Sequence, residues 1–508
     1  MTHDSGTLAA LIEKQARHQP DKTYALGCQS GQSISFGDLA RDCRQVVQWL
    51  QALGSQPGDV ISVVMPNGLQ TLRLLLGAMY GGWCVNPVNL LSQQEQMRYV
   101  LDHSDCRVVF VSPDFEAVVR ASLQALDREV TVVVTDADAS MIPEPGATGV
   151  KVVPDVRGPS PSGLALLMYT SGTTGKPKGV MLSQANLLAN ASAISREHHL
   201  SASDRVLAVL PLYHINAFVV TMLTPLVHGG SLAITPKFSS ARFWEQALTT
   251  SCTWINVVPT IVSYLLEGGD PPPGSSQIRF CRSASAALPP EHLRAFEKRF
   301  GIGVIETMGL TETAAPAFSN PLEPSLRKVG AVGRASGCEA RIVDANLQAV
   351  ADGVTGELVI RGPNVMMGYY KNQEATDAAF TSDGWLRSGD LGHRDSDGFY
   401  FVTGRIKELI IKGGENIAPR EIDEALLRHP GVLEAAVVAV PDKHYGQEIL
   451  ACVVSRDGIA CDERTLRAHC EQTVGRYKTP RYFRFISELP RGPSGKVQRL
   501  KLLDLVTV

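Results

Sequence analysis

The sequence predicts an α/β protein with a large N-terminal domain of parallel-rich sheets covered by helices, a small β subdomain, and a small α+β C-terminal domain. The chain has 508 residues, more than one hydrophobic core ordinarily serves, so at least two domains are expected. Short apolar runs also alternate with amphipathic helical stretches. That alternation is typical of a mainly parallel sheet flanked by helices.

Individual segments support this alternation. Leu8–Ala16 and Phe36–Leu53 have the apolar spacing of amphipathic helices, and the run 59–65 indicates a strand that ends at a Pro-Asn-Gly turn. The segment 151–163 is rich in Pro, Gly and Ser and is expected to be a linker. Further expected elements are a helix at 72–80, strands at 108–111, 130–134 and 164–168, subdomain strands at 340–343 and 357–361, a late helix at 421–429, and late strands at 435–440 and 449–454.

Composition argues against several classes of protein. The net charge is −3, from 48 basic and 51 acidic residues, so general attraction to nucleic acid or membranes is not expected. The 10 cysteines have no metal-ligand spacing and indicate reduced thiols in a cytoplasmic protein. No secretory signal opens the chain. The apolar tract Val206–Val227 is interrupted by prolines, His214 and Asn216, so it is interpreted as core strand, loop and helix rather than a membrane span.

The tract Tyr169–Gly179, YTSGTTGKPKG, follows the expected strand at 164–168. Glycines leave backbone N–H groups uncovered, and a nest of such groups with nearby hydroxyls and lysines attracts phosphate. The nucleotide-binding P-loop pattern does not fit, because Thr170 replaces its first glycine and Pro177 follows Lys176. The alternative to a phosphate loop is a flexible surface turn.

This tract resembles the signature loop of the adenylate-forming enzymes, a family that includes acyl-CoA synthetases, luciferases and the adenylation domains of peptide synthetases. The resemblance spans Tyr169–Lys496. It implies that the loop binds the phosphates of ATP. The residues expected to do so are Thr170, Ser171, Gly172, Thr173, Thr174, Gly175, Lys176 and Lys178.

The tract 306–312, ETMGLTE, resembles the Tyr-Gly-x-Thr-Glu motif of the same family. The resemblance implies that Thr311 contacts the α-phosphate and that Glu312 holds the Mg²⁺ bridging the phosphates. Met308 stands where an aromatic ring usually stacks on adenine, and a thioether can also pack against a ring. Glu306 and Thr307 are expected beside it at the nucleotide.

The C-terminal part carries three further motifs of the family. Ser388-Gly-Asp390 resembles the ribose-binding motif, which makes Asp390 a ribose ligand. The run 404–417 then implies a nucleotide contact from Arg405, a hinge at Lys407, and a coenzyme A face at Lys412, Gly413 and Gly414. The loop 490–499 resembles the terminal lysine loop, with Lys496 as the adenylation lysine. The alternative for that loop is a solvated basic tail.

Two segments resemble the acid pocket of the family. His214 and Asn216 belong to an aromatic/His segment, and His214 is expected to assist catalysis at the pocket wall, although a lone histidine is more often a core residue. The strip from Ser283 departs from the family pattern, with Ala284 in place of glycine and Ala287 in place of proline. Arg282, Ser283 and Ala284 are expected to face the acid, and Ser285 to lie near the adenosine.

The resemblance implies an ATP-dependent acid–CoA ligase that forms acyl-AMP and pyrophosphate and then acyl-CoA and AMP, with ATP, Mg²⁺ and coenzyme A as cofactors. Residues 1–404 would form the adenylation domain and 405–508 a mobile C-terminal domain. The run 280–286 looks most like the oxalate–CoA ligase branch. With Ala284 narrowing the pocket and Arg282 beside it, a short polar, dicarboxylic or sulfonated acid is expected.

Other functions remain open from the sequence. The apolar run 214–220 suits a medium-chain or aromatic acid. An adenylation enzyme that loads a separate carrier protein would carry the same motifs, and so would a non-catalytic binding protein on this fold, although intact Lys496, Glu312 and Asp390 argue against the last. The sequence leaves assembly as a homodimer open.

Overall fold

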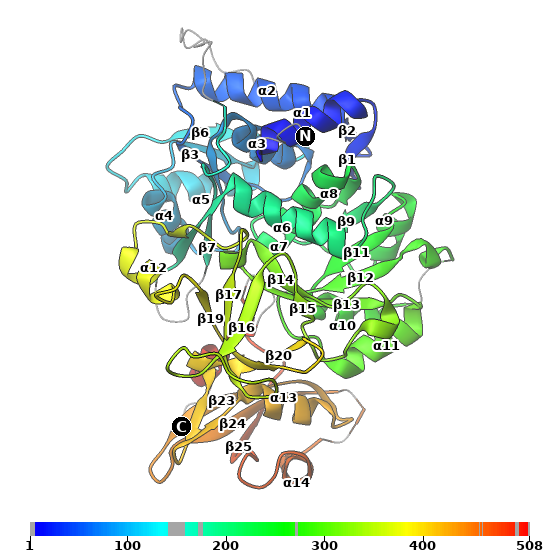
Figure 1. Ribbon diagram of the computed structural model, residues 1–508, viewed down its shortest axis with the longest axis vertical. Helices are drawn as coiled ribbons and strands as arrows, with labels where there is room; N and C mark the ends of the chain where they lie inside the picture. The colour runs from blue at the N-terminus through cyan, green and yellow to red at the C-terminus, as the bar shows by residue number, and fades with distance from the viewer. Residues whose placement is uncertain are drawn as a thin grey trace.

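The structure is a computed structural model that describes residues 6–140, 158–170, 176–269, 273–456, 458–459, 461–492 and 497–505. Figure 1 shows a large N-terminal part, coloured blue to yellow-green, with a smaller C-terminal part in orange below it. This arrangement confirms the predicted α/β class with a large and a small domain. Most of the expected linker 151–163 lies outside the described residues.

Within the described residues, seven strands form the sheet that carries the expected phosphate loop, in the order β18-β8-β7-β4-β3-β5-β6. Strands β7, β4, β3, β5 and β6 are parallel, whereas β8 and β18 are antiparallel to their neighbours. The bounds are β3 (Val60–Val64), β4 (Cys84–Pro87), β5 (Val108–Val111), β6 (Thr131–Val134), β7 (Leu164–Thr170), β8 (Lys178–Ser183) and β18 (Gly368–Tyr369).

Helices that pack around this sheet begin at recognisable sequence signals. Helix α2 starts with a capping box, in which the Ser35 hydroxyl accepts a hydrogen bond from the Asp38 N–H and the Asp38 carboxylate accepts one from the Ser35 N–H. The bounds are α1 (Leu8–His18), α2 (Phe36–Ala52), α3 (Leu69–Gly81), α4 (Gln94–His103), α5 (Pro113–Leu123) and α6 (Gln184–Glu197). The expected helices at 8–16, 36–53 and 72–80 are therefore confirmed.

A second sheet has nine described strands in the order β15-β14-β13-β12-β11-β9-β10-β1-β2. Its strands are β1 (Thr23–Gly27), β2 (Ser33–Ser35), β9 (Arg205–Ala208), β10 (Ser231–Ile234), β11 (Trp254–Val257), β12 (Phe280–Ser283), β13 (Val304–Leu310), β14 (Ala315–Ser319) and β15 (Arg334–Ala335). Its helices are α7 (Ile215–Ala217), the π-helix η1 (Phe218–Leu223), α8 (Thr224–His228), α9 (Phe243–Thr249), α10 (Pro259–Glu267), the 3₁₀ turn η2 (Ser275–Gln277) and α11 (Pro290–Phe300).

The apolar tract 206–227 thus forms a strand, a loop and short helices, as expected. No described helix has the length and apolar character needed to cross a membrane.

The β subdomain is an antiparallel sheet in the order β16-β17-β19-β20. Its elements are β16 (Glu339–Val343), β17 (Gly356–Arg361), α12 (Gln373–Ala379), β19 (Leu386–Arg394) and β20 (Tyr400–Arg405), preceded by the 3₁₀ turns η3 (Thr311–Thr313) and η4 (Pro324–Leu326). The strands expected at 340–343 and 357–361 correspond to β16 and β17.

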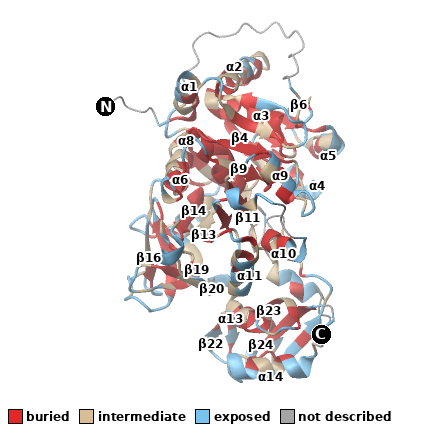
Figure 2. Ribbon diagram, turned by 90° about the vertical axis from the view of Figure 1, so that its right-hand side faces the viewer, coloured by how far each residue is buried: buried red, intermediate tan, exposed pale blue. Residues whose placement is uncertain are grey.

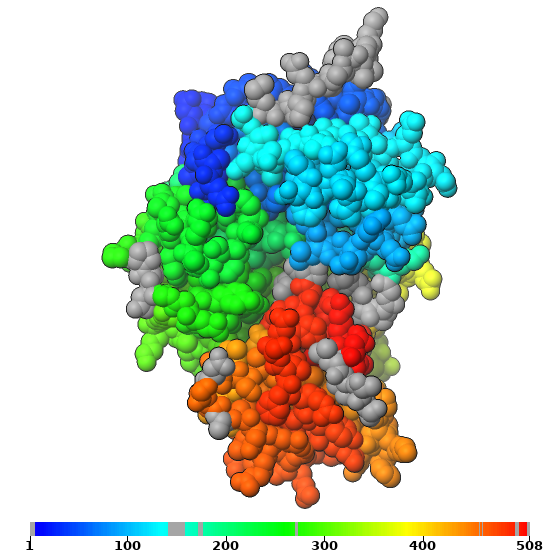
Figure 3. Space-filling view, turned by 180° about the vertical axis from the view of Figure 1, so that it is seen from behind, coloured from blue at the N-terminus to red at the C-terminus, as the bar shows by residue number. Residues whose placement is uncertain are grey.

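The C-terminal part has its own hydrophobic core. Two clusters of buried side chains there contain only residues beyond 409, and Figure 2 shows their strands as a buried layer separate from the large sheets. Seen from behind, the C-terminal part, in orange to red, lies below the large domain (Figure 3). The elements are η5 (Ile406–Glu408), β21 (Ile410–Lys412), β22 (Glu415–Ile417), α13 (Pro419–Leu427), β23 (Val432–Asp442), β24 (Gly446–Ser455), α14 (Glu463–Thr473), β25 (Tyr482–Phe485) and η6 (Arg499–Leu505).

Candidate active site

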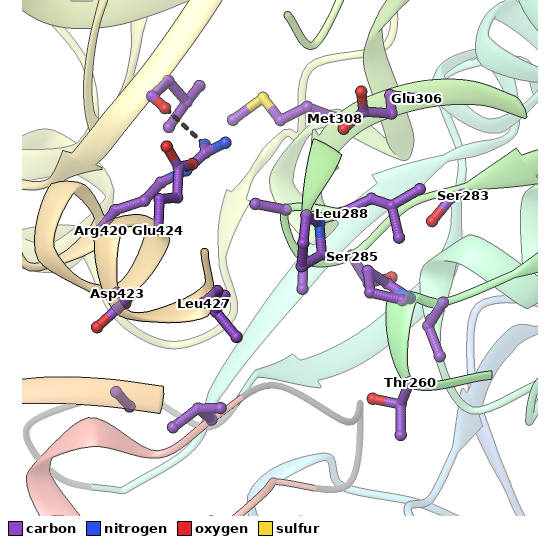
Figure 4. A pocket seen from close by; sticks show the side chains of 18 of the residues that line it. Thr260, Ser283, Ser285, Leu288, Glu306, Met308, Arg420, Asp423, Glu424 and Leu427 are labelled. Atoms are coloured by element: carbon purple, nitrogen blue, oxygen red, sulfur yellow. Dashed lines mark hydrogen bonds and ion pairs between the residues drawn. The ribbon is translucent and has the colours of Figure 1, made fainter. Parts of the chain in front are cut away.

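A cavity of about 370 Å³ lies between the large domain and the C-terminal domain. Figure 4 shows α13 on one side of it and the ends of the large-domain strands on the other. The lining side chains from the two large sheets and their helices include Thr260, Ser283, Ser285, Leu288, Glu306, Thr307 and Met308. Those from the β subdomain and the C-terminal domain include Asp390, Arg405, Arg420, Glu424 and Arg491. Seven of the predicted site residues therefore meet at one cavity: Ser283, Ser285, Glu306, Thr307, Met308, Asp390 and Arg405.

The acidic side chain at the large-domain wall is Glu306, on β13. It is buried, and the Gly330 N–H donates a hydrogen bond to it (3.3 Å). Burial raises the pKa of Glu306 to about 7, while that N–H and the nearby Arg420 guanidinium act in the opposite direction. Met308 packs partly against the core of the β subdomain and leaves a thioether at the cavity wall.

The predicted ribose ligand and its neighbour form an ion pair at the other wall. Arg405 Nε lies 2.8 Å from Asp390 Oδ1, and the Asp390 side chain is buried. The two residues are paired across the antiparallel strands β19 and β20. The predicted hinge, Lys407, follows at once in η5 and is exposed.

The expected phosphate loop connects two antiparallel strands, β7 and β8, with Thr170 opposite Lys178. This confirms that it is not the strand-loop-helix arrangement of a P-loop. Two lysines lie over aromatic rings: Lys176 Nζ is 5.4 Å from the Tyr99 ring centre, and Lys178 Nζ is 4.8 Å from that of Tyr369. The predicted ligands Ser171, Gly172, Thr173, Thr174 and Gly175 lie outside the described residues, and so does Lys496.

The predicted metal ligand lies in the turn η3, beside Thr311. The Tyr369 hydroxyl donates a hydrogen bond to Glu312 Oε1 (2.8 Å). Across the described part of the chain, no three His, Cys, Asp or Glu side chains gather as a protein-only metal site. A single carboxylate fits a Mg²⁺ that is otherwise held by substrate phosphates and water, which is how Mg²⁺ is usually bound with ATP.

Two of the predicted acid residues, Arg282 on β12 and Asn216 in α7, belong to a buried polar network. The Arg282 side chain is fully buried, and its Nη1 donates to Asn216 Oδ1 (2.9 Å) and to Asn256 Oδ1 (2.7 Å). Asn216 Nδ2 donates in turn to the hydroxyl of Ser285 (3.3 Å), which lines the cavity. Burial lowers the pKa of Arg282 to about 9, so the guanidinium is still charged at neutral pH.

Nothing in the described structure neutralises this cation directly. Arg282 Nε and Nη2 have no hydrogen-bond partner, and both partners of Nη1 are neutral amides. His214 is half-buried at the start of α7, against the Tyr213 ring, and Ala284 is buried. Arg282 therefore does not point to solvent or to a structural carboxylate.

Comparison with known proteins agrees with this geometry. Residues 12–370 match the AMP-binding enzyme family, and residues 421–496 match the AMP-binding enzyme C-terminal domain. The chain belongs to the AMP-binding enzyme family. The predicted class, an AMP-forming acid–CoA ligase of the adenylate-forming enzymes, is confirmed.

Among the AMP-binding enzymes, the chain is similar over nearly its full length to the following two curated relatives and two solved structures. The chain is 59% identical to the sulfoacetate–CoA ligase of Cupriavidus necator, over 98% of this chain and 97% of that protein. It is 34% identical to the oxalate–CoA ligase of Arabidopsis thaliana, over 98% of each. ATP-bound MatB of Rhodopseudomonas palustris superposes with a TM-score of 0.89 at 29% identity, covering 98% of each chain, and apo MatB with 0.79, covering 99% of each.

Sequence reasoning missed three residues that lie beside predicted site residues: Asn256 beside Arg282, Tyr369 beside Glu312, and Arg420 at the cavity wall near Glu306. Asn256 carries a signal, since it is an amide within the apolar run Trp254–Val258. A buried amide in such a run needs a polar partner, and Arg282 beside it on β12 provides one. Tyr369 reaches the site because β18 pairs with β8, and Arg420 reaches it because α13 packs beside the large domain.

The structure corrects the expectation that Lys412 contacts coenzyme A. Its side chain is almost fully buried in the C-terminal domain, where its ammonium pairs with Glu448 and donates to the Tyr477 carbonyl (3.0 Å). The Tyr477 hydroxyl donates back to the Lys412 carbonyl (2.6 Å). Lys412 therefore anchors the turn between β21 and β22. Gly413 and Gly414 form that turn with positive φ angles of 55° and 90°, which favour glycine.

We expect Lys412→Met to destabilise the C-terminal domain. It would leave the Glu448 carboxylate buried without its counter-charge, which lowers the free energy of unfolding by about 3–5 kcal/mol. Chemical denaturation of the full chain measures this loss. The double variant Lys412→Met/Glu448→Leu removes both charges and is expected to recover most of the stability. A double variant as unstable as the single one would contradict the anchoring role.

Proposed function

We propose that this AMP-forming acid–CoA ligase activates a short acid that carries a second anionic group, a sulfonate above all. The observation that carries the proposal is the buried guanidinium of Arg282, which has a free Nε–Nη2 edge and no carboxylate partner. The sulfoacetate–CoA ligase relative supports the choice of a sulfonate. The oxalate–CoA ligase relative keeps a dicarboxylate as the alternative second group.

Electrostatics favour a dianionic acid at this place. A buried charge without a counter-charge is costly, and two amide oxygens compensate it only in part. The free edge of Arg282 presents two N–H groups side by side, which match two oxygens of a carboxylate or a sulfonate. Binding of the second anionic group would therefore neutralise a cation that the protein already holds in place.

The medium-chain or aromatic alternative is less well supported by the packing. The run 215–220 is buried in α7 and η1 within the main hydrophobic core, so its apolar character is explained by packing. Ala284 adds a buried methyl group to the strip where the family has glycine. Close-packed interiors leave no room for a longer chain without rearrangement.

The first half-reaction joins two anions, so positioning and charge neutralisation must carry it. In our proposal the 169–179 loop and Lys178 hold the departing β- and γ-phosphates, Thr311 contacts the α-phosphate, and Lys496 neutralises the developing charge. Glu312 would hold Mg²⁺, which as a Lewis acid would stabilise the negative charge of the phosphates. Met308, Glu306 and Thr307 would hold the adenine, and Asp390 with Arg405 the ribose.

The second half-reaction requires a change at the domain boundary, which we place at residues 404–405. The C-terminal domain would rotate about Lys407, so that Lys496 leaves and the turn at Gly413 and Gly414 approaches. The coenzyme A thiolate would then displace AMP from the acyl carbon. His214, half-buried at the pocket wall, is proposed to help position the acid. A homodimer, a cytoplasmic location and the exchange of coenzyme A for a carrier protein stay predictions.

A substrate panel tests the proposed function. AMP release with ATP, Mg²⁺ and coenzyme A is measured for sulfoacetate, oxalate, malonate, acetate, butyrate, octanoate and benzoate. We expect a dianion, sulfoacetate first, to have the highest kcat/KM. The highest kcat/KM for octanoate or benzoate would refute the dianion proposal. If thioester forms on a holo-carrier protein but not on free coenzyme A, the carrier-loading alternative is favoured.

We expect Arg282→Met to reverse the preference between mono- and dianionic acids. The loss of the charge pair should cost the dianion about 2–5 kcal/mol in kcat/KM. Methionine fills similar apolar space but leaves the Asn216 and Asn256 amide oxygens without the Arg282 donor, which is expected to cost about 1–3 kcal/mol of stability. Butyrate serves as the control in the same variant, since it has no second anion. An equal loss for butyrate and the dianion would remove Arg282 from the acid site.

A further inference from the structure

Residues 366–370, which we call the strap, connect the expected metal ligand to the strand that leaves the phosphate loop. The Met366 N–H donates to the Glu312 carbonyl (2.8 Å), and the Tyr370 N–H donates to the Gly179 carbonyl (2.8 Å). Between these two bonds, β18 pairs antiparallel with β8. One short segment therefore fixes the distance between the metal-ligand turn and the end of the phosphate loop.

The side chain of Tyr369 contacts the functional groups on both sides of the strap. Its hydroxyl donates to Glu312 Oε1 (2.8 Å), and its ring lies 4.8 Å from Lys178 Nζ. The carboxylate and the ammonium are thus held by opposite parts of one rigid side chain.

We propose that Tyr369 is a positioning residue for the metal-dependent phosphate chemistry. Its hydroxyl orients the Glu312 carboxylate for Mg²⁺, and its ring places Lys178 beside the phosphates. Mg²⁺ demands near-octahedral geometry at about 2.0–2.1 Å, so a carboxylate that rotates freely is a poorer ligand. Partners that hydrogen-bond to a ligating carboxylate fix its orientation in this way. The inference rests on the proposed function, which makes Glu312 the metal ligand.

Tyr369→Phe tests the hydroxyl alone, because the ring and its contact with Lys178 are kept. We expect the Mg²⁺ concentration at half-maximal ATP–pyrophosphate exchange to rise about 10-fold or more, with activity recovering at high Mg²⁺. Binding of Mn²⁺ in the presence of ATP, followed by electron paramagnetic resonance, should weaken by a similar factor. Thioester formation from supplied acyl-AMP should not change, since that step no longer uses the departing phosphates.

Tyr370→Phe is the matched control on the same strap. Its hydroxyl donates to Asp105 on an exposed face, so the variant loses one tyrosine hydrogen bond away from Glu312. We expect its metal dependence to equal that of the unmodified protein. An unchanged metal dependence and unchanged Mn²⁺ binding in Tyr369→Phe would overturn the inference, and so would equal shifts in both variants.

The Mn²⁺–ATP binding measurement needs no acid, so its outcome does not depend on which acid is the substrate. Failure of the unmodified protein to bind metal and ATP would contradict the proposed function itself. Equal binding by the unmodified protein and Tyr369→Phe would contradict only the role of Tyr369.

Discussion

Lys496→Ala is expected to lose about 10²–10³-fold or more in the rate of acyl-AMP formation. A lysine side chain is a cation at neutral pH, so the variant removes a positive charge from the site where, in our proposal, negative charge develops. Arg491 and Val497, the described residues nearest to Lys496 in this segment, line the cavity and form an isolated antiparallel β-bridge with each other. ATP–pyrophosphate exchange measures the loss.

The second half-reaction separates this role from general damage. Thioester formation from supplied acyl-AMP and coenzyme A should be retained in Lys496→Ala. Lys501→Ala is the matched control, because Lys501 is an exposed lysine in η6 of the same terminal segment. Near-normal pyrophosphate exchange in Lys496→Ala would show that the lysine assignment is wrong.

Lys407→Pro is expected to have the opposite effect, with acyl-AMP formation retained and thioester formation almost abolished. Proline fixes φ near −65° and also restricts the residue before it, whereas a hinge must absorb a large change in backbone angles. Lys407 is exposed in a short 3₁₀ turn that directly follows the Asp390–Arg405 pair. Single-turnover measurements of each half-reaction give the two rates separately.

Lys407→Ala controls for the lost side chain, since it keeps the backbone free to rotate. We expect it to behave like the unmodified protein in both half-reactions. If Lys407→Pro slows the two halves equally, the proline has disturbed the nucleotide site and the hinge lies elsewhere.

The sequence could name candidate residues for the acid site, but it could not predict how they contact one another. Arg282 is recognisable in the sequence as a charge next to the pocket strip, but its burial depends on the whole nine-stranded sheet. Asn256 is its neighbour on β11, and Asn216 comes from α7. Separate segments of the chain therefore create the uncompensated cation, and local pattern reasoning cannot join them.

For Lys412, the sequence motif was recognised, but the structural role of its side chain was not predicted. The sequence places it beside two glycines of a recognisable motif, which favours a ligand contact. The structure buries its ammonium against Glu448 and Tyr477, which lie far along the chain. A lysine in a motif can bind a ligand or anchor a turn, and only the packing around it distinguishes the two.

By itself, the sequence determined the α/β class and the elements with strong periodicity, because these depend on local spacing and on glycine and proline. It also determined the adenylate-forming chemistry, since the motifs stand in order along one chain. Only the tertiary structure decided which residues share the cavity, that Arg282 is buried without a carboxylate, and that Tyr369 joins Glu312 to Lys178. Those relations depend on strand order and domain packing, which bring distant residues within hydrogen-bond distance.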